Sequence, residues 1–141
     1  MFKVVSTMDE LLKTFTVRAV VFIGEQNCPY NLEIDEHEHS SIHILGEADD
    51  EPVAAGRIRF PGNYAKLERI AIREQWRGKN YGHELVDFMI QQSLDRGYKI
   101  LKMNAQVQLV EFYGKHGFVK IGDIFDEAGI DHYQMVRHEN A

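Results

Sequence analysis

The chain has 141 residues, of which 44% are hydrophobic and 27% charged, and its formal net charge is −6. These values are ordinary for a globular protein and exclude a disordered or low-complexity chain, while the acidic balance argues against general affinity for DNA or RNA. We expect one domain over residues 1–141, in the cytoplasm, with no membrane span and no signal peptide. The single cysteine excludes an internal disulfide framework.

The first half of the chain predicts a strand, a helix and three further strands. Residues 2–6 favour a short strand, and Thr7 with Glu10 has capping-box spacing, which indicates a helix start. Residues 24–40 are polar and acidic and predict a loop or a broken helix. Two strands, over residues 42–48 and 53–60, flank a predicted hairpin turn at residues 49–51, and a third strand ends at Ile72.

A basic turn with two glycines follows the strand that ends at Ile72, and a helix pattern starts directly after it. Backbone N–H groups at a helix N-terminus have no intrahelical partner, and the helix dipole is positive there. The turn therefore predicts an anion site, with added charge from Arg73, Arg77 and Lys79. Neither the Walker loop nor the Gly-x-Gly-x-x-Gly fingerprint is present.

The second half of the chain alternates helices and strands. The helix after the anion turn is predicted to stop near Gly97, a residue type that favours the C-cap. A strand over residues 99–103, a helix over 107–115 and strands over 118–125 and 131–136 follow. The predicted order is β-α-β-β-β-α-β-α-β-β, without linker or internal repeat.

Four segments resemble a known family. The run from Arg77 to Gly82 resembles the pyrophosphate loop of the GNAT superfamily of N-acetyltransferases, with Asn80 where the family most often has glycine. Asn tolerates the positive φ that such a position requires. Residues 112–118 (Phe-Tyr-Gly-Lys-His-Gly-Phe) resemble the second family signature, and residues 17–35 and 129–135 resemble one small bacterial branch.

The resemblance implies an α/β (α+β) fold with a mixed central sheet of six to seven strands, one splayed strand pair and about four helices. It also implies an acyl-CoA N-acyltransferase that moves acetyl from acetyl-CoA to a primary amine. The implied mechanism is direct attack in a ternary complex, without a metal. Small members of the family are often homodimers. The family usually has a second helix where residues 24–40 lie. The implied coenzyme-binding residues are Ile70, Ala71, Ile72, Arg77, Gly78, Lys79, Asn80, Tyr81, Gly82, Asn104 and Phe112, with the backbone of Ile70 and Ile72 expected to bond the pantetheine arm.

The same resemblance assigns catalytic roles. Tyr113 lies where the family tyrosine approaches the coenzyme sulfur, and a phenol pKa near 10 makes it a proton donor for the departing thiolate; a core tyrosine is the alternative. Glu68 is a candidate base, since some GNAT enzymes place a glutamate there, and a surface carboxylate is its alternative. His132 is a rival base near the same cleft. His116 is read as a residue at a helix C-terminus.

The amino-terminal loop covers the acceptor side in the family, which implies that Glu25, Glu33 and Asp35 bind the acceptor. A solvated acidic loop is the alternative. Arg18 either pairs with these carboxylates, binds an anionic group of the acceptor or lies on the surface. The acidic net charge fits a cationic acceptor. Amino sugars, polyamines, antibiotics, small amines and protein amino groups all remain open.

Two site interpretations and two functions are the alternatives to this assignment. His37, His39 and His43 have spacing that allows chelation, but no further ligand cluster supports a metal, and Cys28 has no neighbour that favours a thiolate. An acyl-CoA-binding sensor without turnover is the main alternative function. A synthase of acyl-homoserine lactones faintly resembles residues 18–35, but such synthases are longer and have a basic docking surface.

Overall fold

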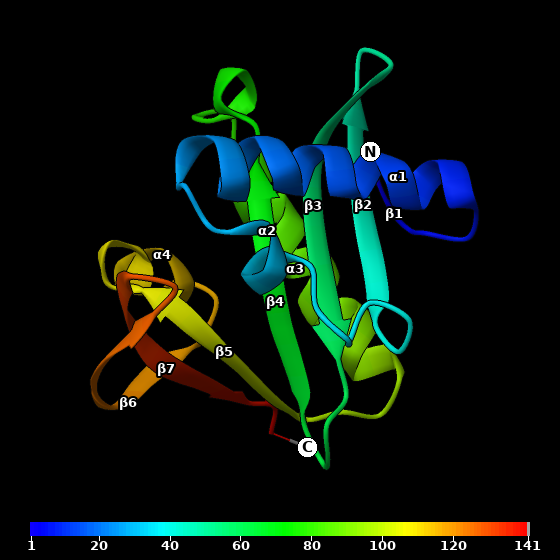
Figure 1. The fold of residues 1–141 in the computed structure, drawn as a ribbon. Helices are drawn as coiled ribbons and strands as arrows, with labels where there is room; N and C mark the ends of the chain where they lie inside the picture. Colours follow the sequence, from blue (N-terminus) through cyan, green and yellow to red (C-terminus); the bar gives the residue numbers. More distant parts are fainter. Residues whose placement is uncertain (141) are drawn as a thin grey trace.

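The computed structural model describes residues 1–140, and one mixed sheet runs through the molecule (Figure 1). Its seven strands stand in the order β1-β2-β3-β4-β5-β7-β6, and β4–β5 is the parallel pair. The mixed sheet of the GNAT fold is confirmed. The strands are β1 (Phe2–Val4), β2 (Ile42–Ala48), β3 (Glu51–Arg59), β4 (Ala65–Ile72), β5 (Ile100–Gln106), β6 (Val119–Glu127) and β7 (Ile130–His138).

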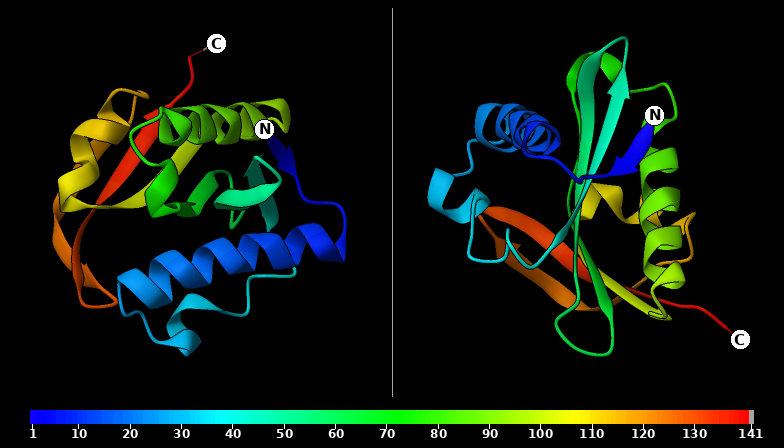
Figure 2. Two further views of the ribbon diagram at one scale, coloured as in Figure 1. Left: turned by 90° about the horizontal axis from the view of Figure 1, so that it is seen from above. Right: turned by 90° about the vertical axis from the view of Figure 1, so that its right-hand side faces the viewer.

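Two long helices cover opposite faces of the sheet, as the view from above shows (Figure 2). Helix α1 (Met8–Arg18) packs on β2, β3 and β4, and α3 (Tyr81–Asp95) packs on β3 and β4 from the other side. The chain leaves α1 through a π-helical segment, η1 (Ala19–Glu25), and then forms the single turn of α2 (Tyr30–Glu33). The polar segment 24–40 is therefore mostly loop, and α2 lies where the resemblance implies a second helix.

Local signals in the sequence explain several element boundaries. The Thr7 hydroxyl accepts from the backbone N–H of Glu10, whose carboxylate accepts from the backbone of Thr7, so the predicted capping box is confirmed. Asp49 and Asp50 both have positive φ, as a two-residue hairpin turn requires, but the predicted turn residue Glu51 already belongs to β3.

Between residues 107 and 115 the predicted helix is shorter than expected. A 3-10 turn, η3 (Val107–Leu109), precedes α4 (Val110–Gly114), because the chain must turn sharply out of β5 before it can form an α-helix. The short α4 packs against β5 and β6.

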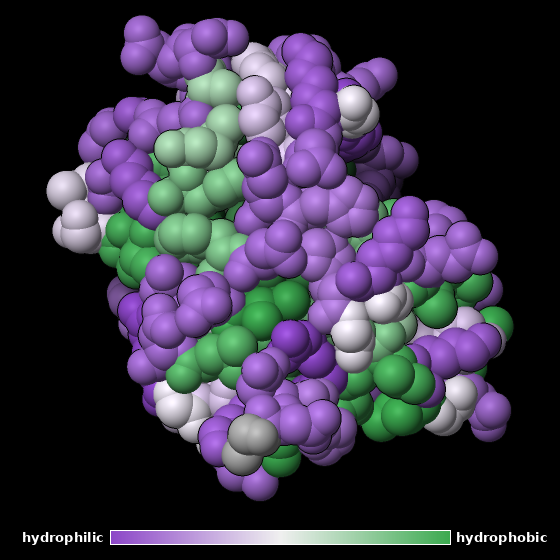
Figure 3. Space-filling view, turned by 180° about the vertical axis from the view of Figure 1, so that it is seen from behind, coloured by the Kyte–Doolittle hydropathy of each residue, from purple (hydrophilic) through white to green (hydrophobic). Residues whose placement is uncertain are grey.

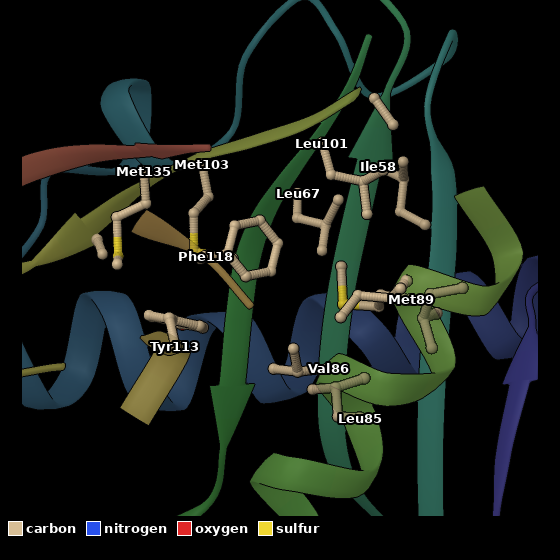
Figure 4. Packing of buried hydrophobic residues seen from close by; sticks show 14 of the residues in the cluster. Ile58, Leu67, Leu85, Val86, Met89, Leu101, Met103, Tyr113, Phe118 and Met135 are labelled. Atoms are coloured by element: carbon tan, nitrogen blue, oxygen red, sulfur yellow. The ribbon is translucent and has the colours of Figure 1, made fainter. Parts of the chain in front are cut away.

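The main core lies between the sheet and helices α3 and α4. Figure 4 shows Met89 and Leu85 of α3 beneath Ile58 and Leu67, and Tyr113 beside Phe118 and the methionines of β5 and β7. Gly56 on β3 allows this packing, because a Cβ there would lie 2.6 Å from the Met89 sulfur. Strand β3 therefore approaches α3 closely at Gly56.

The surface opposite α1 is largely hydrophilic, with separate hydrophobic patches (Figure 3). Within residues 1–140, the helices are all too short or too polar to cross a membrane.

Candidate active site

A splayed strand pair opens a cavity in the middle of the sheet. Strands β4 and β5 are paired only at Ala65–Leu101 and Lys66–Lys102, and beyond these positions they diverge (Figure 1). Diverging strands leave backbone N–H and C=O groups free of a sheet partner. The cavity has a volume of about 390 Å³ and is lined by residues of η1, α2, β3, β4, β5, α4 and β7.

Strand β4 has an irregularity where it borders this cavity. Arg57 of β3 pairs with Glu68 and Ala55 pairs with Ala71, so Arg69 and Ile70 together lie opposite one residue of β3. Arg69 takes a positive φ of 53° at this bulge. The bulge changes the direction of the strand at the cavity wall, and Glu68, Arg69 and Ile70 all line the cavity.

Tyr113 lies on α4 at the cavity, and its side chain is 6% exposed. Its ring is fixed by edge-to-face contacts with Phe112 and Phe118, at centroid distances of 5.1 and 6.4 Å. Burial raises the pKa of Tyr113 above its ordinary value, because the phenolate would lose its hydration. The hydroxyl therefore keeps its proton at neutral pH and can act as a donor.

His132 lies on β7, is 6% exposed and lines the same cavity. One ring nitrogen, Nδ1, lies 2.7 Å from the carbonyl oxygen of Ile130. A carbonyl oxygen only accepts, so Nδ1 is the donor, and in the neutral ring Nε2 then carries the lone pair. Nε2 lies 3.6 Å from Oε2 of Glu127, whose other oxygen, Oε1, accepts from the Asn104 amide. This arrangement leaves a proton-accepting nitrogen at the cavity.

Glu68 also lines the cavity, but its carboxylate is already paired with cations. Oε1 accepts from Arg59 Nε and from Arg57 Nη2, and Oε2 lies 3.8 Å from Lys66 Nζ. Burial is the strongest influence on Glu68 and raises its pKa, but the Arg59 hydrogen bond and the charges of Arg57, Lys66 and Arg59 together hold the pKa below its ordinary value. Glu68 is consequently a weak proton acceptor.

The residues expected at the acceptor side form a buried ion network. Arg18 is 1% exposed and donates to Glu33 and to both oxygens of Glu38, and it is not among the residues that line the cavity. Glu33 and Asp35 do line the cavity, and Asp35 accepts a bidentate pair from Arg57 at 2.8 and 3.0 Å. Of the predicted acceptor residues, the structure brings Glu33 and Asp35 to the cavity.

The basic turn is built as an open helix N-terminus. Gly78 and Asn80 have positive φ of 78° and 71°, and Asn80, the N-cap of α3, makes no side-chain capping bond. The helix start packs tightly on α4, since a Cβ on Gly82 would lie 3.2 Å from the Phe112 ring. Within residues 1–140 no protein acceptor covers the first N–H groups of α3, which leaves them available to an anion.

Arg77 and Glu25 face each other across this turn. Arg77 donates to the carbonyl oxygen of Ile72 at 2.8 Å and to Glu25 at 2.7 Å, and its side chain is 43% exposed. Glu25, expected at the acceptor, is thus placed beside the anion turn and outside the set of residues that line the cavity. Ile72 and Ala71 pair with β3, while Ile70 and Asn104 line the cavity.

Two arginines that the sequence patterns do not single out line the cavity, Arg59 and Arg69, and a third, Arg57, is buried behind it and pairs with Asp35 and Glu68. Alternation along β3 places Arg57 and Arg59 on one face, and this spacing was the signal that could have identified them. Arg69 offered no such signal, because its orientation depends on the bulge.

A metal role for the histidine-rich segment receives no structural support. Among residues 1–140 no group of three or more His, Cys, Asp or Glu side chains is arranged to hold a metal ion. The buried His43 ring nitrogen Nε2 instead lies 2.8 Å from the carbonyl oxygen of Glu38. Cys28 lines the cavity, and burial raises the pKa of its thiol, which disfavours the thiolate.

Comparison with known proteins agrees with this architecture. A family model described as an acetyltransferase (GNAT) domain matches residues 12–138. The protein named "Uncharacterized N-acetyltransferase YjcF" of Bacillus subtilis (strain 168) is 40% identical over 136 residues, which cover 95% of this chain and 97% of that protein.

Two solved structures share the fold. The crystal structure of an acyl-CoA N-acyltransferase from Pseudomonas aeruginosa superposes with a TM-score of 0.88 at 26% identity and covers 97% of this chain and 98% of its own. The crystal structure of a GNAT family acetyltransferase from Elizabethkingia anophelis with acetyl-CoA bound has a TM-score of 0.76 at 13% identity. The match covers 98% of this chain and 97% of that chain. The present chain belongs to the GNAT acetyltransferase family.

Proposed function

We propose that this protein transfers the acetyl group of acetyl-CoA to a primary amine by direct attack in a ternary complex. The observation that carries the proposal is the meeting of a protonated phenol, Tyr113, and an imidazole lone pair, His132 Nε2, at one cavity in the splay between β4 and β5. Amine acetylation needs a proton acceptor and a proton donor on the two sides of one carbonyl.

Coenzyme binding follows from two features of the fold. The open N-terminus of α3 offers N–H groups and a positive dipole to the pyrophosphate, with Arg77 and Lys79 beside it. The unpaired stretch of β4 can bond the amides of the pantetheine arm, which would then act as an added strand. The Elizabethkingia neighbour, with acetyl-CoA bound on the same fold, supports this assignment.

The chemical step uses both groups. The neutral amine nitrogen attacks the thioester carbonyl carbon, a C–N bond forms and the C–S bond breaks. His132 Nε2 takes the proton that the attacking nitrogen loses, and the Tyr113 hydroxyl gives its proton to the departing thiolate. The ion pairs of Glu68 lower its basicity, so Glu68 is not the base of this step. It instead holds the side chains of Arg59 and Arg57 in place.

Two measurements test the proposal. Acetyl-CoA should raise the melting temperature, since a ligand that binds only the folded state stabilises it. Thiol release from acetyl-CoA should then depend on added amine across a panel of amino sugars, amino acids, diamines and peptides. A melting shift without thiol release on any acceptor would contradict turnover and support the sensor reading, and no shift at millimolar acetyl-CoA would contradict coenzyme binding.

A further inference from the structure

The carboxylates at the acceptor side of the cavity are already paired with cations of the protein. Glu33, Asp35, Glu38 and Glu68 are each paired with arginine, and the connected network contains four arginines and one lysine against these four carboxylates. The acidic residues that suggested a cationic acceptor are therefore already neutralised. An acceptor with an ammonium group on this side would have to compete with the arginines for the same carboxylates.

Of the two arginines of this network that line the cavity, Arg59 leaves more donors free, because Arg69 already donates through Nε and Nη2. The Nε of Arg59 donates to Glu68, which fixes the guanidinium, while Nη1 and Nη2 have no acceptor among residues 1–140. Neither nitrogen is a buried unpaired atom, and the side chain is 18% exposed and lines the cavity. Two parallel N–H groups on a planar, oriented guanidinium match the two oxygens of a carboxylate.

The other wall of the cavity has the opposite charge. Glu127 lines it beside His132, is 45% exposed, and accepts one hydrogen bond from Asn104. An acceptor with an amine at one end and a carboxylate at the other would meet complementary charges at both walls. A diamine would instead place a cation near Arg59, where the neighbouring carboxylate of Glu68 is already paired with arginine.

From this geometry we infer that the acceptor is an amino-carboxylate, a compound of the amino-acid class, whose carboxylate is bound by the free Nη groups of Arg59. The inference rests on the proposed function for the identity of the reacting amine, but the carboxylate site itself requires only that the ligand bind. Arg59 is thus a specificity-determining residue at the acceptor side of the cavity.

The test compares acceptors that differ only by a carboxylate: ornithine with putrescine, and phenylalanine with 2-phenylethylamine. Binding is measured by calorimetry on the protein saturated with coenzyme A, and turnover by thiol release from acetyl-CoA. At least one amino acid should bind and react about 10-fold better than its decarboxylated partner, the usual gain from a charge-assisted pair.

Variants at Arg59 make the test specific. Arg59→Gln should remove the preference for the carboxylate, while Arg59→Lys, which keeps a cation beside Glu68 without the fork, should lose most of it. The matched control is Arg96→Gln, since Arg96 is exposed at the C-cap of α3 and its side chain bonds only to Gln92 of that helix. Melting temperature and coenzyme affinity, both expected to be unchanged in Arg59→Lys, separate lost recognition from lost folding.

The outcomes separate the two proposals. Binding of amino acids that depends on Arg59, but without thiol release, would support this inference and contradict the proposed function. Acetylation of the decarboxylated amines as well as or better than the amino acids, unaffected by Arg59→Gln, would overturn the inference and leave the proposed function standing. Absence of binding for every amino acid tested would likewise overturn it.

Discussion

Tyr113 is the residue on which the chemistry depends most directly. Its hydroxyl is kept protonated by burial, and its ring is fixed by Phe112 and Phe118. If it protonates the leaving thiolate, Tyr113→Phe should lower kcat by about 10²-fold or more, the usual scale for general acid catalysis. The KM for acetyl-CoA should change little, because the ring packing is retained.

The matched control for this substitution is Tyr98→Phe, because Tyr98 stacks on Phe60 and is not among the cavity-lining residues. It should leave kcat unchanged. Near-full kcat in Tyr113→Phe, with chemistry shown to be rate-limiting, would make Tyr113 a packing residue and place the acid elsewhere.

His132 and Glu68 can be separated as bases by the loss of activity in each variant. His132→Gln removes the free Nε2 and should lower kcat/KM by about 10²-fold. Glu68→Gln should lower kcat/KM much less, because arginine pairing holds the pKa of Glu68 below its ordinary value and makes the carboxylate a weak proton acceptor. A larger loss in Glu68→Gln than in His132→Gln, with both variants folded, would assign the base to Glu68.

At the scale of elements, the anion turn and α3 act together. Arg77 bridges the end of β4 and Glu25 of η1, and so it joins the turn to the amino-terminal segment. Arg77→Ala should weaken coenzyme A binding by about 1–3 kcal/mol, the worth of a charge-assisted hydrogen bond, as measured by calorimetry. The rate at saturating coenzyme should be less affected, since Arg77 is remote from the thioester in the proposed complex.

Glu25→Gln gives the comparison for this prediction. It removes the carboxylate that competes with phosphate for Arg77 and keeps the side-chain size, so coenzyme affinity should stay the same or increase. Unchanged affinity in Arg77→Ala would show that the backbone N–H groups of α3 hold the pyrophosphate without this side chain.

Elements with a local cause were predictable from the sequence. Thr7 and Glu10 cap α1, two aspartates form the β2–β3 turn, and Asn80 adopts the positive φ that its residue type tolerates. The bulge at Arg69 was not predictable, because neither Arg69 nor Ile70 is a turn-forming residue and the pairing of β3 with β4 imposes the conformation.

The candidate site likewise combines residues that short sequence motifs identify with contacts that such motifs do not reveal. Tyr113 and His132 were found from short motifs, and the structure brings both to one cavity. The burial of Arg18 and the pairing of Asp35 with Arg57 depend on contacts between residues 15 to 22 positions apart in the chain, for which single-sequence patterns hold no signal. Charge composition alone therefore favoured a cationic acceptor, whereas the paired charges favour a zwitterionic one.

At the scale of the whole molecule, the ion network joins α1, the segment after α2 and the sheet. Arg18 links α1 to Glu33 and Glu38, and Arg57 links β3 to Glu38 and Asp35. Burial is the largest influence on Glu38 and raises its pKa, but the hydrogen bonds and charge of Arg18, with the charge of Arg57, lower the pKa from 4.5 to about 2. Asp35 is likewise held at about 2 against the effect of burial, chiefly by Arg57.

These depressed pKa values predict acid-dependent stability. Because the unfolded chain takes up protons at a higher pH than the folded one, the stabilisation is complete above about pH 4.5 and is lost as the pH falls toward 2. For Glu38 alone the full shift corresponds to at most about 3 kcal/mol of unfolding free energy. Denaturant unfolding at several pH values between 6 and 2 should show this decline in unfolding free energy.

The variant Glu38→Gln should be less stable than the wild type at pH 6, because it leaves Arg18 incompletely paired. Its unfolding free energy should fall less steeply as the pH is lowered. The control is Glu36→Gln, at a side chain that is 83% exposed, and it should follow the wild-type curve. Equal slopes for wild type and Glu38→Gln would show that the network does not govern acid stability.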